Sequence, residues 1–215
     1  MPHARIVRCL CYDQADYQTL WDLQRALVDS RQQQLCDDQI IFAEHTPVYT
    51  IGRSGSESEI LRRDPAIPII RSDRGGRVTY HGPGQLMVYL VWDISGHSRE
   101  VRQLVRQLEE VVQRTLAPFG IRASSDERRP GLWVGRDKIA AIGLRITRGV
   151  VYHGLAINRD PDLAAFANII PCGIRDGGVT SMARLGVNAT RPELERQLIQ
   201  AFETTFAITF DRSSI

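Results

Sequence analysis

The stretch Lys138-Ile-Ala-Ala-Ile-Gly-Leu-Arg-Ile-Thr-Arg-Gly-Val-Val-Tyr-His-Gly-Leu-Ala-Ile157 contains two apolar runs with Arg148-Gly149 between them. A glycine in a short break between two strand-forming runs indicates a β-hairpin. If the turn has two residues, Gly143 lies opposite Gly154 and Ala141 lies opposite Ala156. The chain is therefore expected to form an antiparallel pair of strands at 138–146 and 150–157.

The small residues of this hairpin are expected to leave an unfilled strip along the sheet. Protein interiors are close-packed, so a strip without side chains is normally filled by another group. An acyl chain fits such a strip, and so does a closely packed helix. The residues alone do not choose between these two interpretations.

The rest of the chain shows strands and helices in no regular alternation. Strands are expected at 4–10, 40–44, 48–51, 67–71 and 85–93. Apolar residues at helical spacing predict three helices: one capped by Asp13, one starting near Ser98, and one opening with a capping box at Thr190. Because the order is not a repeated βαβ unit, the predicted fold class is α+β, a mixed β-sheet flanked by helices.

The composition is that of an ordinary globular protein, 43% apolar and 24% charged, and no repeat or linker divides the sequence. Residues 1–215 are therefore expected to form a single domain. A net charge of +2 with scattered basic residues gives no nucleic-acid footprint. No apolar run reaches the roughly 18 residues of a membrane span. The first residues lack a secretory signal, so a cytoplasmic protein is expected.

The basic residues are 26 arginines and a single lysine, Lys138. A lineage that favours arginine accounts for the arginines. It accounts less well for the one lysine, because arginine replaces lysine on a surface but not where an amine must lose its proton. A chemical role for Lys138 and its survival by chance both stay open.

Cys172 is the cysteine whose surroundings indicate reactivity. It lies in Asn168-Ile-Ile-Pro-Cys-Gly-Ile174, where proline and glycine indicate an exposed turn. A nearby ammonium lowers the pKa of a thiol, and Lys138 is the candidate. The other three cysteines are expected to serve packing, and the cysteine and histidine spacing predicts no metal site.

A glycine-rich segment precedes the longest predicted strand: Arg74-Gly-Gly-Arg-Val-Thr-Tyr-His-Gly-Pro-Gly-Gln85. Its glycines let the backbone approach a ligand closely, but their spacing fits neither a Walker loop nor a dinucleotide fingerprint. The segment is either a binding loop or a pair of tight turns around a short strand at 78–80.

The same segment, extended to Tyr89, resembles the motif of the lipoyl(octanoyl) transferases. Three further stretches resemble that family in the right order: Lys138-Ile-Ala-Ala-Ile-Gly143, His153-Gly-Leu-Ala-Ile-Asn158, and Pro171-Cys-Gly173 followed by Gly178-Val-Thr-Ser181. Together they span residues 74–181, with no departure at the matched positions. Residues 1–70 and 182–215 carry little of the resemblance.

The resemblance implies a fold similar to the catalytic domains of biotin and lipoate protein ligases, and an enzyme that needs no cofactor. It implies transfer of octanoyl from octanoyl-acyl carrier protein to a lysine of lipoyl domains, such as those of 2-oxoacid dehydrogenase complexes, in lipoate biosynthesis. By position, Cys172 matches the acyl-thioester nucleophile and Lys138 the residue that lowers its pKa. The residues implied to contact substrate are Arg74, Gly75, Gly76, Arg77, Val78, Thr79, Tyr80, His81, Ala141, Ile142, Gly143, Gly154, Leu155 and Ala156.

Three further residues each keep two interpretations. His81 and His153 lie beside glycines, where each either carries a proton or orients a loop. Thr180 either positions the Cys172 loop or caps a short element. Three other functions stay as alternatives: an ATP-dependent lipoate- or biotin-type ligase, which does not need Cys172, a non-catalytic module that binds lipoyl domains, and a thiol hydrolase, which only its products distinguish from a transferase.

Overall fold

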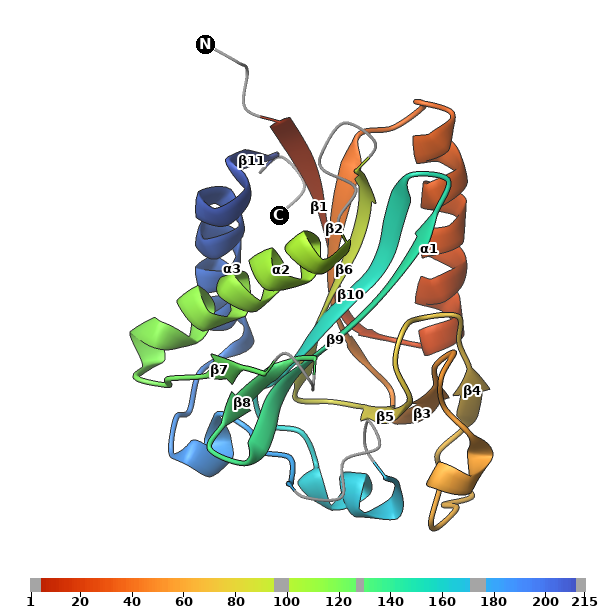
Figure 1. Cartoon of the computed structure of the whole chain (residues 1–215), viewed down its shortest axis with the longest axis vertical. Coiled ribbons are helices and arrows are strands. Elements are labelled where there is room, and N and C mark those ends of the chain that lie inside the picture. The colour runs from red at the N-terminus through yellow and green to blue at the C-terminus, as the bar shows by residue number, and fades with distance from the viewer. Residues whose placement is uncertain (1–4, 95–100, 127–129, 171–176, 212–215) are drawn as a thin grey trace.

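The computed structural model describes residues 5–94, 101–126, 130–170 and 177–211 (Figure 1). The strands are β1 Arg5–Ala15, β2 Asp38–His45, β3 Val48–Ile51, β4 Ile69–Arg71, β5 Val78–His81, β6 Gln85–Asp93, β7 Ser124–Ser125, β8 Leu132–Val134, β9 Asp137–Thr147, β10 Val150–Asn158 and β11 Ile208–Asp211. The helices are α1 Tyr17–Gln32, α2 Val101–Leu116 and α3 Arg191–Phe206, with short 3-10 helices at Glu57–Glu59, Ala117–Phe119, Leu163–Asn168 and Ala183–Leu185.

In the described part of the chain, eight strands form one mixed sheet in the order β11-β1-β2-β6-β10-β9-β8-β7. Strand β1 runs parallel to both of its neighbours, whereas β2, β6, β10 and β9 pair antiparallel in succession. A small second sheet has the order β4-β3-β5, with β3 parallel to β4 and antiparallel to β5. The predicted α+β class with a mixed sheet and flanking helices is confirmed.

Helices cover both faces of the large sheet (Figure 1). Helices α2 and α3 pack on one face, where Leu108 and Leu198 share a core with Val88 of β6. Helix α1 covers the other face, where Leu20 packs against Met87 of the same strand. Neighbouring residues of a strand point to opposite faces, so β6 serves two cores and carries no exposed side.

The predicted hairpin is confirmed, including its register. Strands β9 and β10 meet at Arg148-Gly149, where both residues have positive φ, as a tight two-residue hairpin turn requires. Gly143 lies opposite Gly154, and Ala141 lies opposite Ala156. Because β10 also pairs with β6, the small residues lie inside the large sheet and not at its edge.

The helix ends confirm one predicted cap and correct another. Thr190 forms the expected capping box at the start of α3. Helix α1 is capped by Asp16, so the prediction of Asp13 was wrong. The reason is that β1 continues to Ala15 through its pairing with β2, which keeps Asp13 in the strand. The start of α2 that was expected near Ser98 lies outside the described residues.

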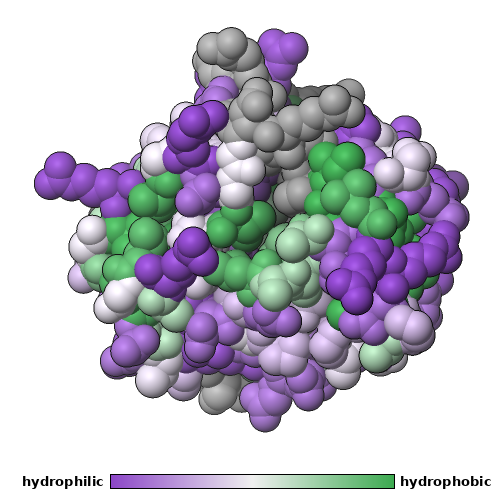
Figure 2. All heavy atoms as spheres, turned by 90° about the horizontal axis from the view of Figure 1, so that it is seen from below, coloured by the Kyte–Doolittle hydropathy of each residue, from purple (hydrophilic) through white to green (hydrophobic). Residues whose placement is uncertain are grey.

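Figure 2 shows the end of the molecule that carries the small sheet. Apolar patches occupy its central part, with hydrophilic side chains between and around them. None of the helices in the described ranges combines the length and the apolar character that crossing a bilayer requires.

Candidate active site

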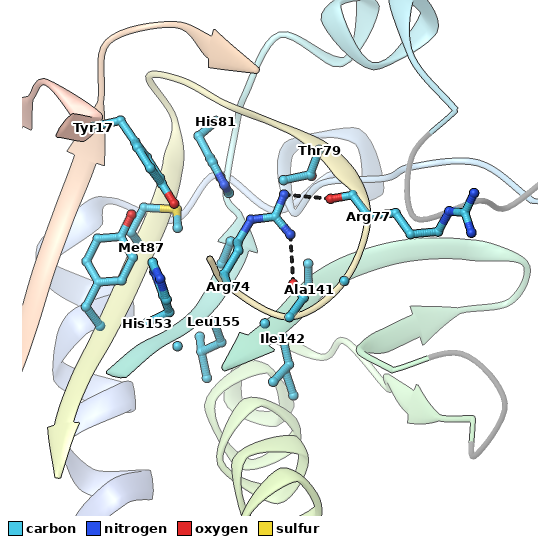
Figure 3. A pocket seen from close by; sticks show the side chains of 16 residues that line it. Tyr17, Arg74, Arg77, Thr79, His81, Met87, Ala141, Ile142, His153 and Leu155 are labelled. Carbon is cyan, nitrogen blue, oxygen red and sulfur yellow. Dashed lines mark hydrogen bonds between the residues drawn. The ribbon is translucent and has the colours of Figure 1, made fainter. Parts of the chain in front are cut away.

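A pocket lies where the loop after β4 meets the β9–β10 hairpin (Figure 3). Its wall also includes α1, the end of β5 and the start of β6. The lining residues are Tyr17, Arg74, Gly75, Gly76, Arg77, Thr79, His81, Met87, Tyr89, Ala141, Ile142, Gly143, His153, Gly154, Leu155 and Ala156. The fold therefore brings together three separate segments that the resemblance connected with substrate.

Strand alternation divides the residues of β5 between the pocket and a core. Thr79 and His81 line the pocket. Val78 and Tyr80 point the other way and pack with Tyr49 in the core of the small sheet. The structure thus places these two residues of the glycine-rich segment away from the pocket.

The guanidinium of Arg74 holds the glycine-rich loop in shape. It donates from Nε and Nη2 to Thr50 Oγ1, at 3.1 and 2.8 Å, from Nη1 to the carbonyl of Gly75 at 2.9 Å, and from Nη2 to that of Arg77 at 2.8 Å (Figure 3). The N–H of Gly75 donates to the carbonyl of Leu144 in β9 at 2.9 Å. Arg74 therefore builds this wall of the pocket and ties it to β3.

The small residues of the hairpin are explained in part by this loop. A Cβ on Gly143 would lie 2.9 Å from the carbonyl oxygen of Gly75, and one on Gly154 would lie 1.9 Å from that of Val88. Both positions are thus closed to a side chain by neighbouring backbone. The strip predicted from the sequence is filled partly by the chain itself, and the pocket lies beside it.

Asp73, directly before Arg74, anchors the loop to β10. His153 Nε2 lies 2.8 Å from Asp73 Oδ1, and the hydroxyl of Tyr152 donates to Oδ2. Burial opposes ionisation of Asp73, but these hydrogen bonds outweigh it and lower its pKa to about 2. Burial lowers the pKa of His153 despite the Asp73 carboxylate. The contact with Asp73 joins His153 of β10 to the glycine-rich loop.

His81 belongs to a second network, which runs to the far end of β10. His81 Nδ1 lies 2.6 Å from Gln85 Oε1, Gln85 Nε2 donates to Asn158 Oδ1 at 2.8 Å, and Asn158 Nδ2 donates to the carbonyl of Thr180 at 2.9 Å. Burial, reinforced by the charge of Arg74, holds the pKa of His81 well below its ordinary value.

Sequence reasoning gave no role to Asp73, Gln85 or Asn158. Gln85 and Asn158 lie inside the quoted motifs, at the ends of two apolar strands, and both are buried. A buried polar residue at a strand end requires a hydrogen-bond partner, and that requirement was the available signal. Asp73 offered only its position before the glycine-rich segment.

Lys138 is buried near the start of β9. Its N–H donates to the carbonyl of Gly178 at 2.9 Å, and its carbonyl accepts from the N–H of Thr180 at 3.0 Å. Its ammonium donates to the carbonyl of Pro130 at 2.9 Å and lies 4.8 Å from the ring centroid of Trp133. The backbone of Thr180 thus supports Lys138, whereas the predicted nucleophile Cys172 lies outside the described residues.

Comparison with known proteins gives a consistent family. Residues 16–203 match the family model of the lipoyl protein ligase A/B catalytic domain. An octanoyltransferase from Magnetococcus marinus is 50% identical over 169 residues, which cover 79% of each chain. An octanoyltransferase from Laribacter hongkongensis is 43% identical over 192 residues, which cover 89% of this chain and 92% of the relative.

Solved structures share the fold at low sequence identity. The bipartite lipoate protein ligase of Thermoplasma acidophilum has a TM-score of 0.75 at 19% identity, over 99% of this chain and 88% of that one. A biotin protein ligase from Aquifex aeolicus has a TM-score of 0.53 at 12% identity, over 95% of this chain and 69% of that one. The expected similarity to these ligase folds is confirmed. By its family match and its sequence relatives, the chain belongs to the octanoyltransferases of the lipoyl protein ligase A/B catalytic domain family.

Proposed function

We propose that this octanoyltransferase takes its acyl group from octanoyl-acyl carrier protein onto Cys172 and passes it to a lysine of a lipoyl domain. The observation that carries the proposal is the place of Lys138. It lies on the same strand as Ala141 in the pocket wall, and its backbone pairs with residues 178–180, which follow the Pro171-Cys-Gly173 motif.

The first step exchanges one thioester for another. The Cys172 thiolate attacks the octanoyl thioester, the phosphopantetheine thiol of the carrier leaves, and an octanoyl-enzyme results. Because a thioester is broken and a thioester is formed, the step needs no ATP. The ammonium of Lys138 favours the thiolate form of Cys172 and can protonate the thiolate that leaves, which releases the carrier as its thiol.

The second step forms an amide. The lipoyl-domain lysine must be neutral to attack, because an ammonium has no lone pair on nitrogen. Lys138, deprotonated after the first step, takes the proton directly or through a water that it orients. The pocket wall at Ala141 and Ala156 supplies apolar surface for the octanoyl chain.

The test combines the purified enzyme with octanoyl-acyl carrier protein and an unmodified lipoyl domain, without ATP. Mass spectrometry of the lipoyl domain should show the gain of one octanoyl group, which peptide mapping places on a lysine. Transfer that requires free octanoate and ATP would instead support a ligase, and release of free octanoate would support a hydrolase. Binding of the lipoyl domain without modification would support a non-catalytic module.

A further inference from the structure

Three successive hydrogen bonds determine which ring nitrogen of His81 carries its proton. A backbone carbonyl only accepts, so the Thr180 carbonyl receives an N–H from Asn158 Nδ2 at 2.9 Å. Asn158 Oδ1 then accepts from Gln85 Nε2 at 2.8 Å, and Gln85 Oε1 is left facing His81 Nδ1 at 2.6 Å. Nδ1 must therefore be the donor, and Nε2 keeps its lone pair.

That lone pair has no partner among the described residues. His81 Nε2 is buried and makes no hydrogen bond, although the side chain is only 4% exposed. Figure 3 shows the ring pointing from β5 toward the pocket that it lines. A buried polar atom without a hydrogen bond is costly, so its place in a pocket wall indicates a partner that arrives with the substrate. Because Nε2 offers a lone pair, this partner must be a donor.

The surroundings of His81 keep it neutral. Its ring stacks on Tyr17 with centroids 5.9 Å apart. Burial lowers its pKa, and the charge of Arg74 and the nearby rings of His45 and His153 act in the same direction, against the hydrogen bond to Gln85. A histidine in this environment keeps the proton on Nδ1, accepts a hydrogen bond at Nε2 and does not take up a second proton. Proton removal from the substrate therefore belongs to another group.

A chain of hydrogen bonds connects His81 to the backbone of Lys138. Gln85 is the partner of Asn158 across β6 and β10, and Asn158 reaches Lys138 through the backbone of Thr180. His153 lies farther along β10, beside the pair formed by Gly154 and Tyr89, and its partner Asp73 lies in the loop after β4. The two histidines thus serve different parts of the pocket.

Resting on the proposed function, we propose that His81 is a further catalytic residue, whose Nε2 accepts an N–H of the neutral amine of the lipoyl-domain lysine. The hydrogen bond turns the nitrogen lone pair toward the carbonyl carbon of the octanoyl thioester. Gln85 and Asn158 are positioning residues, because they hold the tautomer that leaves this acceptor free.

The step balances without a further reactant. The attacking amine has two N–H groups, and one of them donates to His81 Nε2 throughout. The nitrogen lone pair forms the N–C bond, the C–S bond breaks, and its electron pair stays on the sulfur of Cys172. The second N–H proton passes to that sulfur. The products are a secondary amide, which keeps the first N–H, and the free thiol.

The test separates the two half-reactions in single-turnover experiments. In His81→Asn, the shorter amide still bonds to Gln85 but places no acceptor where Nε2 was, whereas the longer side chain of His81→Gln restores one. In both variants, octanoylation by octanoyl-acyl carrier protein should slow by a clearly smaller factor than the second half-reaction does in His81→Asn. Consumption of preformed octanoyl-enzyme by lipoyl domain should slow at least about tenfold in His81→Asn and recover partly in His81→Gln.

His45→Asn is the matched control. His45 is a buried histidine of the same aromatic cluster, but both of its ring nitrogens are partnered, by the carbonyl of Ala15 at 2.8 Å and the hydroxyl of Tyr89 at 2.5 Å. It does not line the pocket. Its substitution should not slow the second half-reaction selectively.

Three results would overturn the proposal. Equal slowing of both half-reactions in His81→Asn would mean that His81 only packs against its neighbours. Slowing of octanoylation alone would mean that His81 acts on the phosphopantetheine thioester of the carrier. Nitrogen-15 NMR of the wild-type imidazole should show protonated Nδ1 and bare Nε2 at pH 7, and the reverse tautomer would refute the role whatever the variants do. A wild-type enzyme that forms no octanoyl-enzyme would refute the proposed function instead.

Discussion

Around the pocket, the charged residues Arg74 and Asp73 hold the wall in shape. The guanidinium of Arg74 donates hydrogen bonds to Thr50, Gly75 and Arg77. The carboxylate of Asp73 accepts hydrogen bonds from His153 and Tyr152. Among the described residues, the ammonium of Lys138 donates to the carbonyl of Pro130 and lies over the ring of Trp133. An ammonium has three N–H donors, and the proposed function assigns the proton transfers to this lysine.

Replacing Lys138 by arginine should abolish most of the transfer while keeping the charge. A guanidinium stabilises a thiolate, but it does not release its proton near neutral pH. Steady-state transfer to the lipoyl domain should therefore fall at least about 100-fold, the range of a lost acid–base group, while some octanoyl-enzyme still forms. Turnover close to wild type in Lys138→Arg would rule out the proton-transfer role.

Asp73 should contribute pH-dependent stability. Its pKa is lowered to about 2, so its hydrogen bonds stabilise the folded state above the unfolded pKa of about 4 and lose that effect as pH falls toward 2. With the carboxylate side chain 35% exposed, the effect is about 1 kcal/mol after allowance for solvent screening. Urea unfolding of wild type and Asp73→Asn should differ by this amount at pH 6, by about half of it at pH 3, and converge only as pH falls toward 2. A difference independent of pH would contradict the assignment.

At the residue scale, the sequence shows which residue type is rare, but it does not show which side chains are in contact. Lys138 was recognisable because it is the single lysine among 26 arginines. The partners of Asp73 lie about 80 positions away along the chain, and no local pattern reports such a pairing. The roles of Asp73 and of Gln85 therefore emerged only from the folded structure.

Among the elements, the β9–β10 hairpin determines the shape of the pocket. Its register follows from a two-residue turn and could be predicted, because turn length alone sets which residues lie opposite. The groups that lie against its small residues could not be predicted, because Gly75 and Val88 belong to segments distant in sequence. Ala141 and Ala156 remain as the small side chains whose size limits the pocket.

Enlarging Ala141 should change the acyl chain length that the enzyme accepts. The leucine side chain of Ala141→Leu extends into the pocket, and each methylene of lost space is worth about tenfold or more in discrimination. Octanoyl transfer should fall at least about tenfold relative to butanoyl transfer, measured with acyl carrier proteins charged with each chain. Ala66→Leu, in an exposed turn, is the control and should leave the ratio unchanged. An unchanged ratio in Ala141→Leu would place the acyl chain elsewhere.

The capping box of α3 should contribute to stability without affecting activity. Thr190 accepts the N–H of Glu193, whose carboxylate in turn accepts the N–H of Thr190. Thr190→Ala should lower the free energy of unfolding by about 1 kcal/mol. Thr204→Ala removes an exposed threonine within the same helix and should change it by less than about 0.5 kcal/mol. If urea unfolding gives the same loss of unfolding free energy for both variants, the cap contributes no more than an ordinary exposed threonine of this helix.

For the whole molecule, the order of strands in space explains how distant motifs meet. The glycine-rich loop crosses from the small sheet to β9, and β10 lies between β6 and β9. The α+β class could be predicted because the elements do not alternate regularly. The order of the strands could not be predicted, since β1 pairs in parallel with β11, which comes from the other end of the chain. Parallel pairing of this kind leaves no turn motif in the sequence.

The central claim is a covalent octanoyl-enzyme on Cys172. It is tested most directly by intact-protein mass spectrometry of wild type and Cys172→Ala after brief incubation with octanoyl-acyl carrier protein and no ATP. We expect one octanoyl group on wild type, none on Cys172→Ala, and loss of the group when lipoyl domain is added. An enzyme that stays unmodified, or a Cys172→Ala variant that still transfers octanoyl to the lipoyl domain, would contradict the claim.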